Sequence, residues 1–269
     1  MRIDNSALKV FQFCPAYYQE RYVHKIEPKV QENTALTFGK VFHRLLEGRL
    51  KGELSFSKEE LFPEVSESIW DECIFTYEKY CQQYPQEDWE TIDVERLVEV
   101  PLTGMFDGMD VYVAKMDWVA RSPEGLRIID HKTEERGSLN NSLQRWQYLT
   151  QVSLYQWAAE QYYHEPIYGI TIDLISRRSL KGRCEPEFQR FTVQRTPWQQ
   201  KQAVETLRYC VEQIKFMQSK EWTDGLWPQN RDNCQKWRWT CAYAALHGED
   251  GRDENILMAK FQAAEEYLI

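Results

Sequence analysis

Asp117, Asp130 and Lys132 place two carboxylates and an ammonium group close together in the sequence. Between the two aspartates lies Ser122-Pro123-Glu124-Gly125, where proline and glycine predict a tight turn. A loop centred on this turn sets Asp117 opposite Asp130, and Lys132 joins them because alternate residues of a strand share a face. Like charges at this spacing repel each other unless a cation lies between them. Oxygen ligands of this kind suit Mg²⁺ or Mn²⁺.

The segments on either side of the turn have the pattern of buried strands. Met116 to Ala120 and Leu126 to Asp130 are short apolar runs, and the predicted register pairs Val119 with Ile128. A surface hairpin whose acidic residues simply face water is the alternative interpretation. A functional site is favoured by the apolar strands on both sides and by a downstream helix whose polar residues fall on one face.

The rest of the chain predicts an α/β fold. Residue patterns predict further strands at 91–100, 104–113, 168–175 and 188–193, and helices at 57–83 (one helix or a pair), 143–163 and 197–217. Near the N-terminus, Pro15 interrupts a helical pattern and is best placed in the first turn of a new helix. No internal repeat or low-complexity tract is present.

Three further groups of polar residues are candidates for function. His43 lies at the border of the apolar face of a helix predicted at 37–47, where a histidine is normally structural and alternatively a ligand. Gln151 and Tyr155, four residues apart, share one face of their helix and could be ordinary interfacial side chains. A cationic loop follows the strand at 168–175, and either solvation or phosphate contact explains it. Its basic residues are Arg177, Arg178, Lys181 and Arg183.

Seven cysteines, an odd number, favour free thiols or metal ligands over disulfides. Near the C-terminus, Cys234, Cys241 and His247 are interleaved with Trp237 and Trp239 in a polar context, and such residues can bind zinc or an iron–sulfur cluster. On spacing alone, thiols packed in the interior are favoured, because no Cys-x-x-Cys pair is present. Four other cysteines are predicted to be packing residues: Cys73, Cys81, Cys184 and Cys210.

Composition limits the class of protein. The chain has 269 residues and a formal net charge of −9, which argues against a general nucleic-acid coat but leaves room for a local basic groove. No apolar segment is long enough to span a membrane, and the first residues lack an apolar signal core. These features predict a soluble intracellular protein.

Taken together, the motifs resemble the RecB-like branch of the PD-(D/E)XK nucleases, which includes CRISPR-associated and phage exonucleases. Four motifs occur in the family's order. Phe38-Gly39-x-x-x-His43-x-x-x-Glu47 is similar to the family's histidine motif, and Asp117 is similar to the acidic residue of its Gly-x-x-Asp element, with Ala114 in place of glycine. Asp130-His131-Lys132-Thr133 is similar to the Asp-x-Lys-Thr signature, and Gln151-x-x-x-Tyr155 to the Gln/Tyr helix. The resemblance implies that His43, Asp117, Asp130 and the carbonyl of His131 bind a metal ion. It also implies that Lys132, with Asp117 and Asp130, is catalytic.

The resemblance also implies a fold and a domain plan. The fold is a PD-(D/E)XK, restriction-endonuclease-like core, with a central mixed sheet flanked by helices, a helical insertion and a metal-clasp region. A single domain covers 1–269, with the clasp at 1–35 and 220–269, the helical insertion at 55–88 and the catalytic sheet core at 91–195.

For the cysteines, the resemblance implies a 4Fe–4S cluster that ties the chain ends together. Its ligands would be Cys14, Cys234, Cys241 and a last residue that is cysteine in the family and His247 here. Three outcomes stay open: a cluster with three cysteines and one histidine, zinc in its place, or no metal.

The predicted function is that of a metal-dependent DNA nuclease, an exonuclease on single-stranded or end-frayed DNA. Partners would be DNA and proteins of recombination or CRISPR adaptation. The resemblance also implies that the protein is cytoplasmic, in a bacterial, archaeal or phage-infected host cell. The residues expected to contact DNA are Gln151, Tyr155, Arg145, Arg177, Arg178 and Lys181. The alternatives are a non-catalytic DNA-binding or assembly module of the same fold, and a structure-specific or RNA-cleaving endonuclease.

Overall fold

The computed structural model describes residues 1–29, 34–53, 55–102, 110–135, 139–177, 185–219, 227–236, 239–248, 251–252 and 254–264. The chain divides into two compact units. Unit 1 comprises Met1–Gln31, Pro101–Val113 and Val204–Ile269, and unit 2 comprises Glu32–Val100 and Ala114–Ala203. The domain plan predicted from the sequence remains a prediction.

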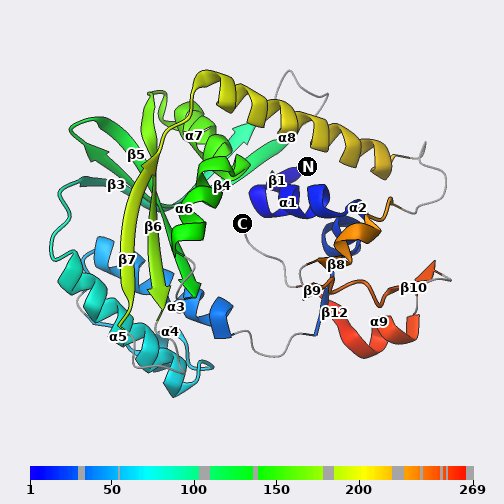
Figure 1. Cartoon of the computed structure of the whole chain (residues 1–269), viewed down its shortest axis with the longest axis horizontal. Coiled ribbons are helices and arrows are strands. Elements are labelled where there is room, and N and C mark those ends of the chain that lie inside the picture. The colour runs from blue at the N-terminus through cyan, green and yellow to red at the C-terminus, as the bar shows by residue number, and fades with distance from the viewer. Residues whose placement is uncertain are drawn as a thin grey trace. The chain divides into compact units, whose positions relative to one another are not determined.

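A mixed β-sheet forms the centre of unit 2 (Figure 1). Strand β4 (Val111–Ser122) is antiparallel to β5 (Gly125–Glu135), and β5 is parallel to β6 (Ile167–Arg177). Strand β7 (Glu187–Val193) is antiparallel to β6, and β3 (Glu90–Pro101) pairs with β4. The mixed sheet confirms the α/β prediction.

The β4–β5 hairpin has the predicted register. Val119 lies opposite Ile128, and the turn is closed by Ser122 opposite Gly125. Gly125 has a φ of 134°, a left-handed conformation that favours glycine. Regular pairing ends at Trp118 opposite Ile129. Asp117 of β4 and Asp130 of β5 are the next residues on the two strands, just beyond the paired region.

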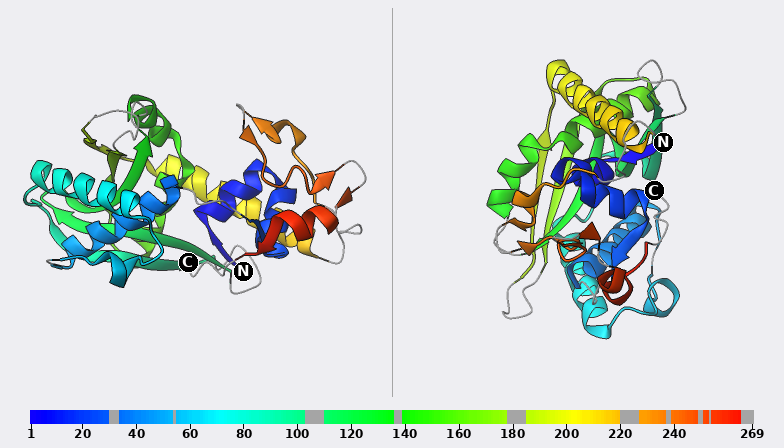
Figure 2. Two further views of the ribbon diagram at one scale, coloured as in Figure 1. Left: turned by 90° about the horizontal axis from the view of Figure 1, so that it is seen from below. Right: turned by 90° about the vertical axis from the view of Figure 1, so that its right-hand side faces the viewer.

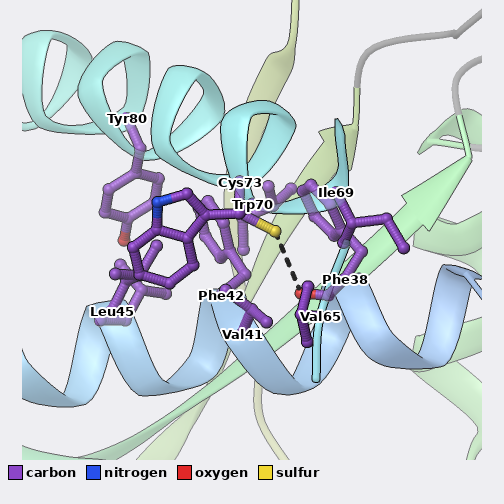
Figure 3. Close-up of a cluster of buried hydrophobic side chains, with 11 residues drawn as sticks. Phe38, Val41, Phe42, Leu45, Val65, Ile69, Trp70, Cys73 and Tyr80 are labelled. Atoms are coloured by element: carbon purple, nitrogen blue, oxygen red, sulfur yellow. Dashed lines mark hydrogen bonds between the residues drawn. The ribbon is translucent and has the colours of Figure 1, made fainter. Parts of the chain in front are cut away.

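Two helices cover one face of this sheet. In Figures 1 and 2, α3 (Thr34–Leu50, blue) and α5 (Glu67–Gln83, cyan) lie side by side. Figure 3 shows their packing, in which the Cys73 thiol donates a hydrogen bond to the Phe38 carbonyl at 3.8 Å. Ile175 of β6 belongs to the same buried cluster, so the core joins helices to sheet. The short α4 (Lys58–Leu61) precedes α5, so the segment predicted as one helix or a pair is a pair.

The prediction of one helix over 143–163 is wrong, because the chain forms two helices there. Helix α6 (Leu139–Tyr148) ends before Leu149, which is extended, and α7 (Thr150–Tyr163) follows. The Arg195 guanidinium donates to the carbonyls of Trp146 and Leu149 at 3.5 and 3.4 Å and thereby satisfies groups that the break leaves open. Helix α7 contacts β6, which is buried along nearly its whole length, as a strand covered on both faces should be.

Unit 1 is built from short elements around both ends of the chain. Strand β1 (Arg2–Asp4) runs parallel to the first residues of β4, and the Asp4 carboxylate caps α1 (Asn5–Phe13). Pro15 begins α2 (Pro15–Tyr18), as predicted, and a π-helix follows at Gln19–Val23. Helix α8 (Pro197–Gln218) enters unit 1 at Val204.

The described C-terminal part of unit 1 consists of very short strands, a 3₁₀-helix (η2) and an α-helix. Its elements are η2 (Arg231–Asn233), β8 (Gln235–Lys236), β9 (Trp239–Thr240), β10 (His247–Gly248), β11 (Gly251–Arg252), α9 (Glu254–Lys260) and β12 (Phe261–Ala263). Strand β12 pairs with β2 (Ile26–Pro28), and the Tyr243 hydroxyl donates to the carbonyl of Ile26 at 2.7 Å.

Two sequence expectations depend on how much of the chain is described. The strand expected at 104–113 falls mostly outside the described residues, and β4 starts at Val111 and continues through the strand expected at 116–120. Among the helices that the structure describes, none has the length and apolarity needed to cross a membrane.

Candidate active site

Five predicted site residues converge at the end of the regular pairing between β4 and β5. His43 of α3 places Nδ1 3.6 Å from Asp117 Oδ2. The backbone N–H of His131 donates to the same oxygen at 2.8 Å. Beside them, Lys132 Nζ lies 2.8 Å from Asp130 Oδ2. A helix and two strands that are far apart in sequence therefore bring these groups into one site.

The two aspartates differ in their electrostatic environment. Burial opposes ionisation of Asp117, but the neighbouring His43, with Lys132 and His131, holds the pKa of this carboxyl well below its usual range. For Asp130, burial raises the pKa, Lys132 opposes that rise and the negative charge of Asp117 adds to it. The repulsion expected between the two carboxylates is therefore present. A divalent cation between them would relieve it.

His43 and Lys132 are the basic groups beside the two aspartates. Burial disfavours the charged form of His43, yet Asp117 beside it raises the pKa of the imidazole overall. Burial also disfavours the charged form of Lys132, but Asp130 and then Asp117 raise the pKa of the ammonium. Lys132 is thus protonated near neutral pH. Its Nζ also lies 5.5 Å from the centroid of the Trp146 ring, a cation–π contact.

Glu95 of β3 is a member of the site that sequence reasoning missed. One donor atom each from His43, Glu95 and Asp117 lies within 4.8 Å of the others. An imidazole and two carboxylates form a donor set that fits a divalent metal ion. The predicted strand at 91–100 placed Glu95 on a strand, but no motif singled it out.

The side chain of His131, a residue of β5, belongs to a buried polar network. Its Nδ1 lies 3.0 Å from Oδ2 of Asp173, a fully buried residue of β6. Asp173 also accepts a hydrogen bond from the Tyr80 hydroxyl and lies 3.3 Å from Arg190 Nε. Arg190 in turn pairs with Glu87 at 2.7 Å. Burial opposes ionisation of Asp173, but His131 and Arg190 lower its pKa overall. This network fixes the residue whose backbone holds Asp117.

The residues predicted to contact DNA are only partly described. Gln151 is buried and Tyr155 half-buried in α7, while Arg145 is exposed and lies 3.3 Å from Glu134. Arg177 ends β6, and its guanidinium lies 5.8 Å from the centroid of the Phe38 ring. Residues Arg178, Lys181 and Arg183 of the cationic loop lie outside the described residues.

In unit 1, the three predicted cysteine ligands lie near one another. The Asn230 N–H donates to Cys14 Sγ at 3.4 Å, and Cys234 Sγ donates to the Asn230 carbonyl at 3.9 Å. The Cys241 N–H donates to the Cys234 carbonyl at 2.8 Å. Burial raises the pKa of the Cys241 thiol, and the neighbouring Cys234 and Cys14 raise it further.

The fourth predicted ligand has another partner. His247 Nε2 lies 3.5 Å from Oε1 of Glu20, a buried residue of the π-helix. The other Glu20 oxygen lies 2.9 Å from His24 Nδ1. Of the two tryptophans noted in the sequence, Trp237 lies outside the described residues and Trp239 is placed by its backbone in β9. Cys73 and Cys210 are buried and Cys81 half-buried, while Cys184 is not among the described residues.

Comparison with known families identifies the fold and the class of enzyme. A match to the PD-(D/E)XK nuclease superfamily extends over residues 5–246. The chain belongs to the PD-(D/E)XK nuclease superfamily. The superfamily consists of nucleases that use divalent metal ions, which agrees with the donor set of the site. The predicted fold class is thereby confirmed.

One solved structure shows the same fold at low sequence identity. A protein from Eubacterium rectale, described as a candidate exonuclease, is 17% identical with a TM-score of 0.54, over 79% of each chain. An alkaline exonuclease from Laribacter hongkongensis is 11% identical with a TM-score of 0.35, over 82% of this chain and 93% of that chain. A TM-score of 0.35 is too low for this second structure to support an inference about the fold or the function. Among curated proteins, no significant sequence match was found.

Proposed function

We propose that this PD-(D/E)XK nuclease is a divalent-metal-dependent deoxyribonuclease of the RecB-like branch, an exonuclease on single-stranded or end-frayed DNA. The observation that carries the proposal is the convergence of His43, Glu95 and Asp117 within 4.8 Å, beside the Asp130–Lys132 ion pair. The Eubacterium rectale neighbour, described as a candidate exonuclease, gives further support.

The roles of the residues follow from the chemistry of phosphodiester hydrolysis. Mg²⁺ or Mn²⁺ would be held by His43, Asp117, Asp130 and the His131 carbonyl, and when bound it would lower the pKa of a water molecule and polarise the phosphate. The protonated Lys132 supplies positive charge where the phosphate becomes more negative. The backbone N–H of His131 keeps Asp117 oriented.

DNA contact in this proposal is made largely through phosphate. Arg145, Arg177, Arg178 and Lys181 grip the backbone, and Gln151 and Tyr155 place the strand at the active site. Binding of this kind is independent of sequence and weakens steeply as salt rises. A protein with net negative charge can bind and cleave DNA in this way, because its basic side chains are concentrated beside the active site.

For unit 1 we propose that Cys14, Cys234 and Cys241 hold an iron–sulfur cluster or zinc, with His247 as the fourth donor. The contacts that link the three cysteines through Asn230 and the Cys234 carbonyl support this, and His247 would exchange its Glu20 contact for the metal. The whole chain would then act as one nuclease domain in the cytoplasm, together with recombination or CRISPR-adaptation proteins.

The decisive experiment measures cleavage of end-labelled DNA. Single- and double-stranded substrates are incubated with the wild type or with Lys132→Ala in Mn²⁺, Mg²⁺ or chelator. Metal-dependent degradation that is lost in the variant supports the nuclease, and the product ladder distinguishes exonuclease from endonuclease action. Intact DNA binding without cleavage in any condition would instead support a binding module, and cleavage of RNA alone would change the substrate class.

A further inference from the structure

Glu95 has a backbone conformation that glutamate rarely adopts. Its φ is 53°, in the left-handed region, although it lies within strand β3. Glycine and asparagine are enriched in this region because other side chains crowd the backbone there. Such a conformation costs free energy and persists only where the surrounding structure imposes it. Glycine would adopt this backbone conformation at a lower cost in free energy. The presence of glutamate here therefore indicates that its carboxylate has a function.

The Glu95 side chain is held beside the active site. Lys115 Nζ binds Glu95 Oε2 at 2.5 Å. Lys115 precedes Asp117 by two residues and so points to the same face of β4. The Glu95 side chain is 16% exposed, whereas that of Lys115 is 56% exposed. The ion pair thus anchors one carboxylate oxygen from the solvent side and leaves the group next to His43 and Asp117.

We infer that Glu95 is a ligand of the divalent metal ion at this site. The inference rests on the proposed function and adds a residue outside the four ligands that the sequence motifs imply. The Asp130 carboxylate is paired with Lys132 at 2.8 Å, whereas Glu95 lies with His43 and Asp117 in a single group of donors. Carboxylates gathered this closely repel each other unless a cation offsets their charge. In the metal-free protein Lys115 pairs with Glu95 and His43 lies beside Asp117, and a divalent ion bound by both carboxylates would take over that role.

The test measures Mn²⁺ binding to the full chain without DNA, by isothermal titration calorimetry and by electron paramagnetic resonance of the bound ion. Two variants remove the carboxylate: Glu95→Gln, which keeps its shape, and Glu95→Gly, which suits the left-handed backbone. Glu99→Gln, an exposed residue four positions along the same strand, is the matched control. We expect both Glu95 variants to weaken Mn²⁺ binding by about 10-fold or more and the control to leave it unchanged.

The glycine variant separates metal binding from folding. With chelator present, Glu95→Gly should melt at or above the wild-type temperature, because the cost of the left-handed backbone is removed. Mn²⁺ should then raise its melting temperature less than that of the wild type. Equal Mn²⁺ affinity in Glu95→Gln and the wild type would overturn the ligand role and leave the proposed nuclease intact. Failure of the wild type itself to bind Mn²⁺ would overturn both.

Discussion

The two predicted metal-binding regions of this chain are built on different kinds of scaffold. In unit 2, the donors of His43, Glu95 and Asp117 come from a 17-residue helix and two 12-residue strands. In unit 1, Cys234 follows a three-residue 3₁₀-helix and Cys241 follows a two-residue strand. Long elements are fixed by packing along their length, whereas elements this short have few contacts of their own.

The difference concerns what a metal ion would contribute in each region. The carboxylates of unit 2 are already gathered by the sheet, so a metal there would serve chemistry and relieve repulsion. In a region of short elements, by contrast, the free energy of metal binding is largely free energy of folding. The comparison predicts that changes in unit 2 alter activity or a buried network, and that loss of metal in unit 1 alters stability.

The largest effect is expected from Lys132→Met. Removing the ammonium should lower the rate of DNA cleavage by about 10²–10³-fold, because its charge is no longer available to the phosphate. The melting temperature should change by only a few degrees, since the sheet and not the lysine places the other groups. Rates come from single-turnover cleavage of labelled DNA. A variant with the wild-type rate would remove Lys132 from the catalytic set.

Asp173→Asn tests the buried polar network of His131, Asp173 and Arg190. The substitution removes the buried charged partner of His131 and leaves Arg190 paired with Glu87 alone, and should lower the free energy of unfolding by about 3 kcal/mol. Urea denaturation measures this value. The control is Glu165→Gln, which removes the exposed ion pair with Arg121 and should leave the free energy of unfolding nearly unchanged, because solvent screens this pair. Similar losses in the two variants would show that the network contributes no more than a surface pair.

Cys241→Ser tests the cysteine region. If metal is bound there, the variant should lose iron or zinc and melt several degrees lower, because a ligand is replaced by a poor one. Metal content is measured by elemental analysis and the transition by calorimetry. Cys81→Ser, also half-buried, is the control and should keep its metal. Wild-type protein that contains no metal after anaerobic purification would contradict the clasp.

The smallest effect is a pH dependence in the metal-free protein. The pKa of His43 is raised above its ordinary value of 6.5, so its pairing with Asp117 stabilises fully below that pH and is lost as pH rises through the folded pKa. The pKa of Asp117 is lowered from 3.8, so its contribution is present above that value. His43→Asn should therefore be destabilised by up to about 1 kcal/mol at about pH 5 to 6, and by less at pH 8. A difference that is constant with pH would exclude the ion pair.

The sequence by itself determined the local parts of the active site. Proline and glycine in the 122–125 turn, with apolar runs on both sides, fixed the register that sets Val119 opposite Ile128. The same periodicity placed Asp130 and Lys132 on one face, where they form an ion pair. These features depend on residues close together in the chain, where turn chemistry and alternation suffice.

The tertiary structure decided the contacts between distant segments. Glu95 joins His43 and Asp117 through the pairing of β3 with β4, and its left-handed backbone has no signature in the sequence. Arg195 donates hydrogen bonds to carbonyls at a helix break some 46 residues earlier, a contact that periodicity does not reveal, so the pattern alone predicted an unbroken helix. His247 meets Glu20 in place of the expected ligand group, because packing brings the two ends of unit 1 together. Such contacts depend on long-range packing, which residue spacing does not encode.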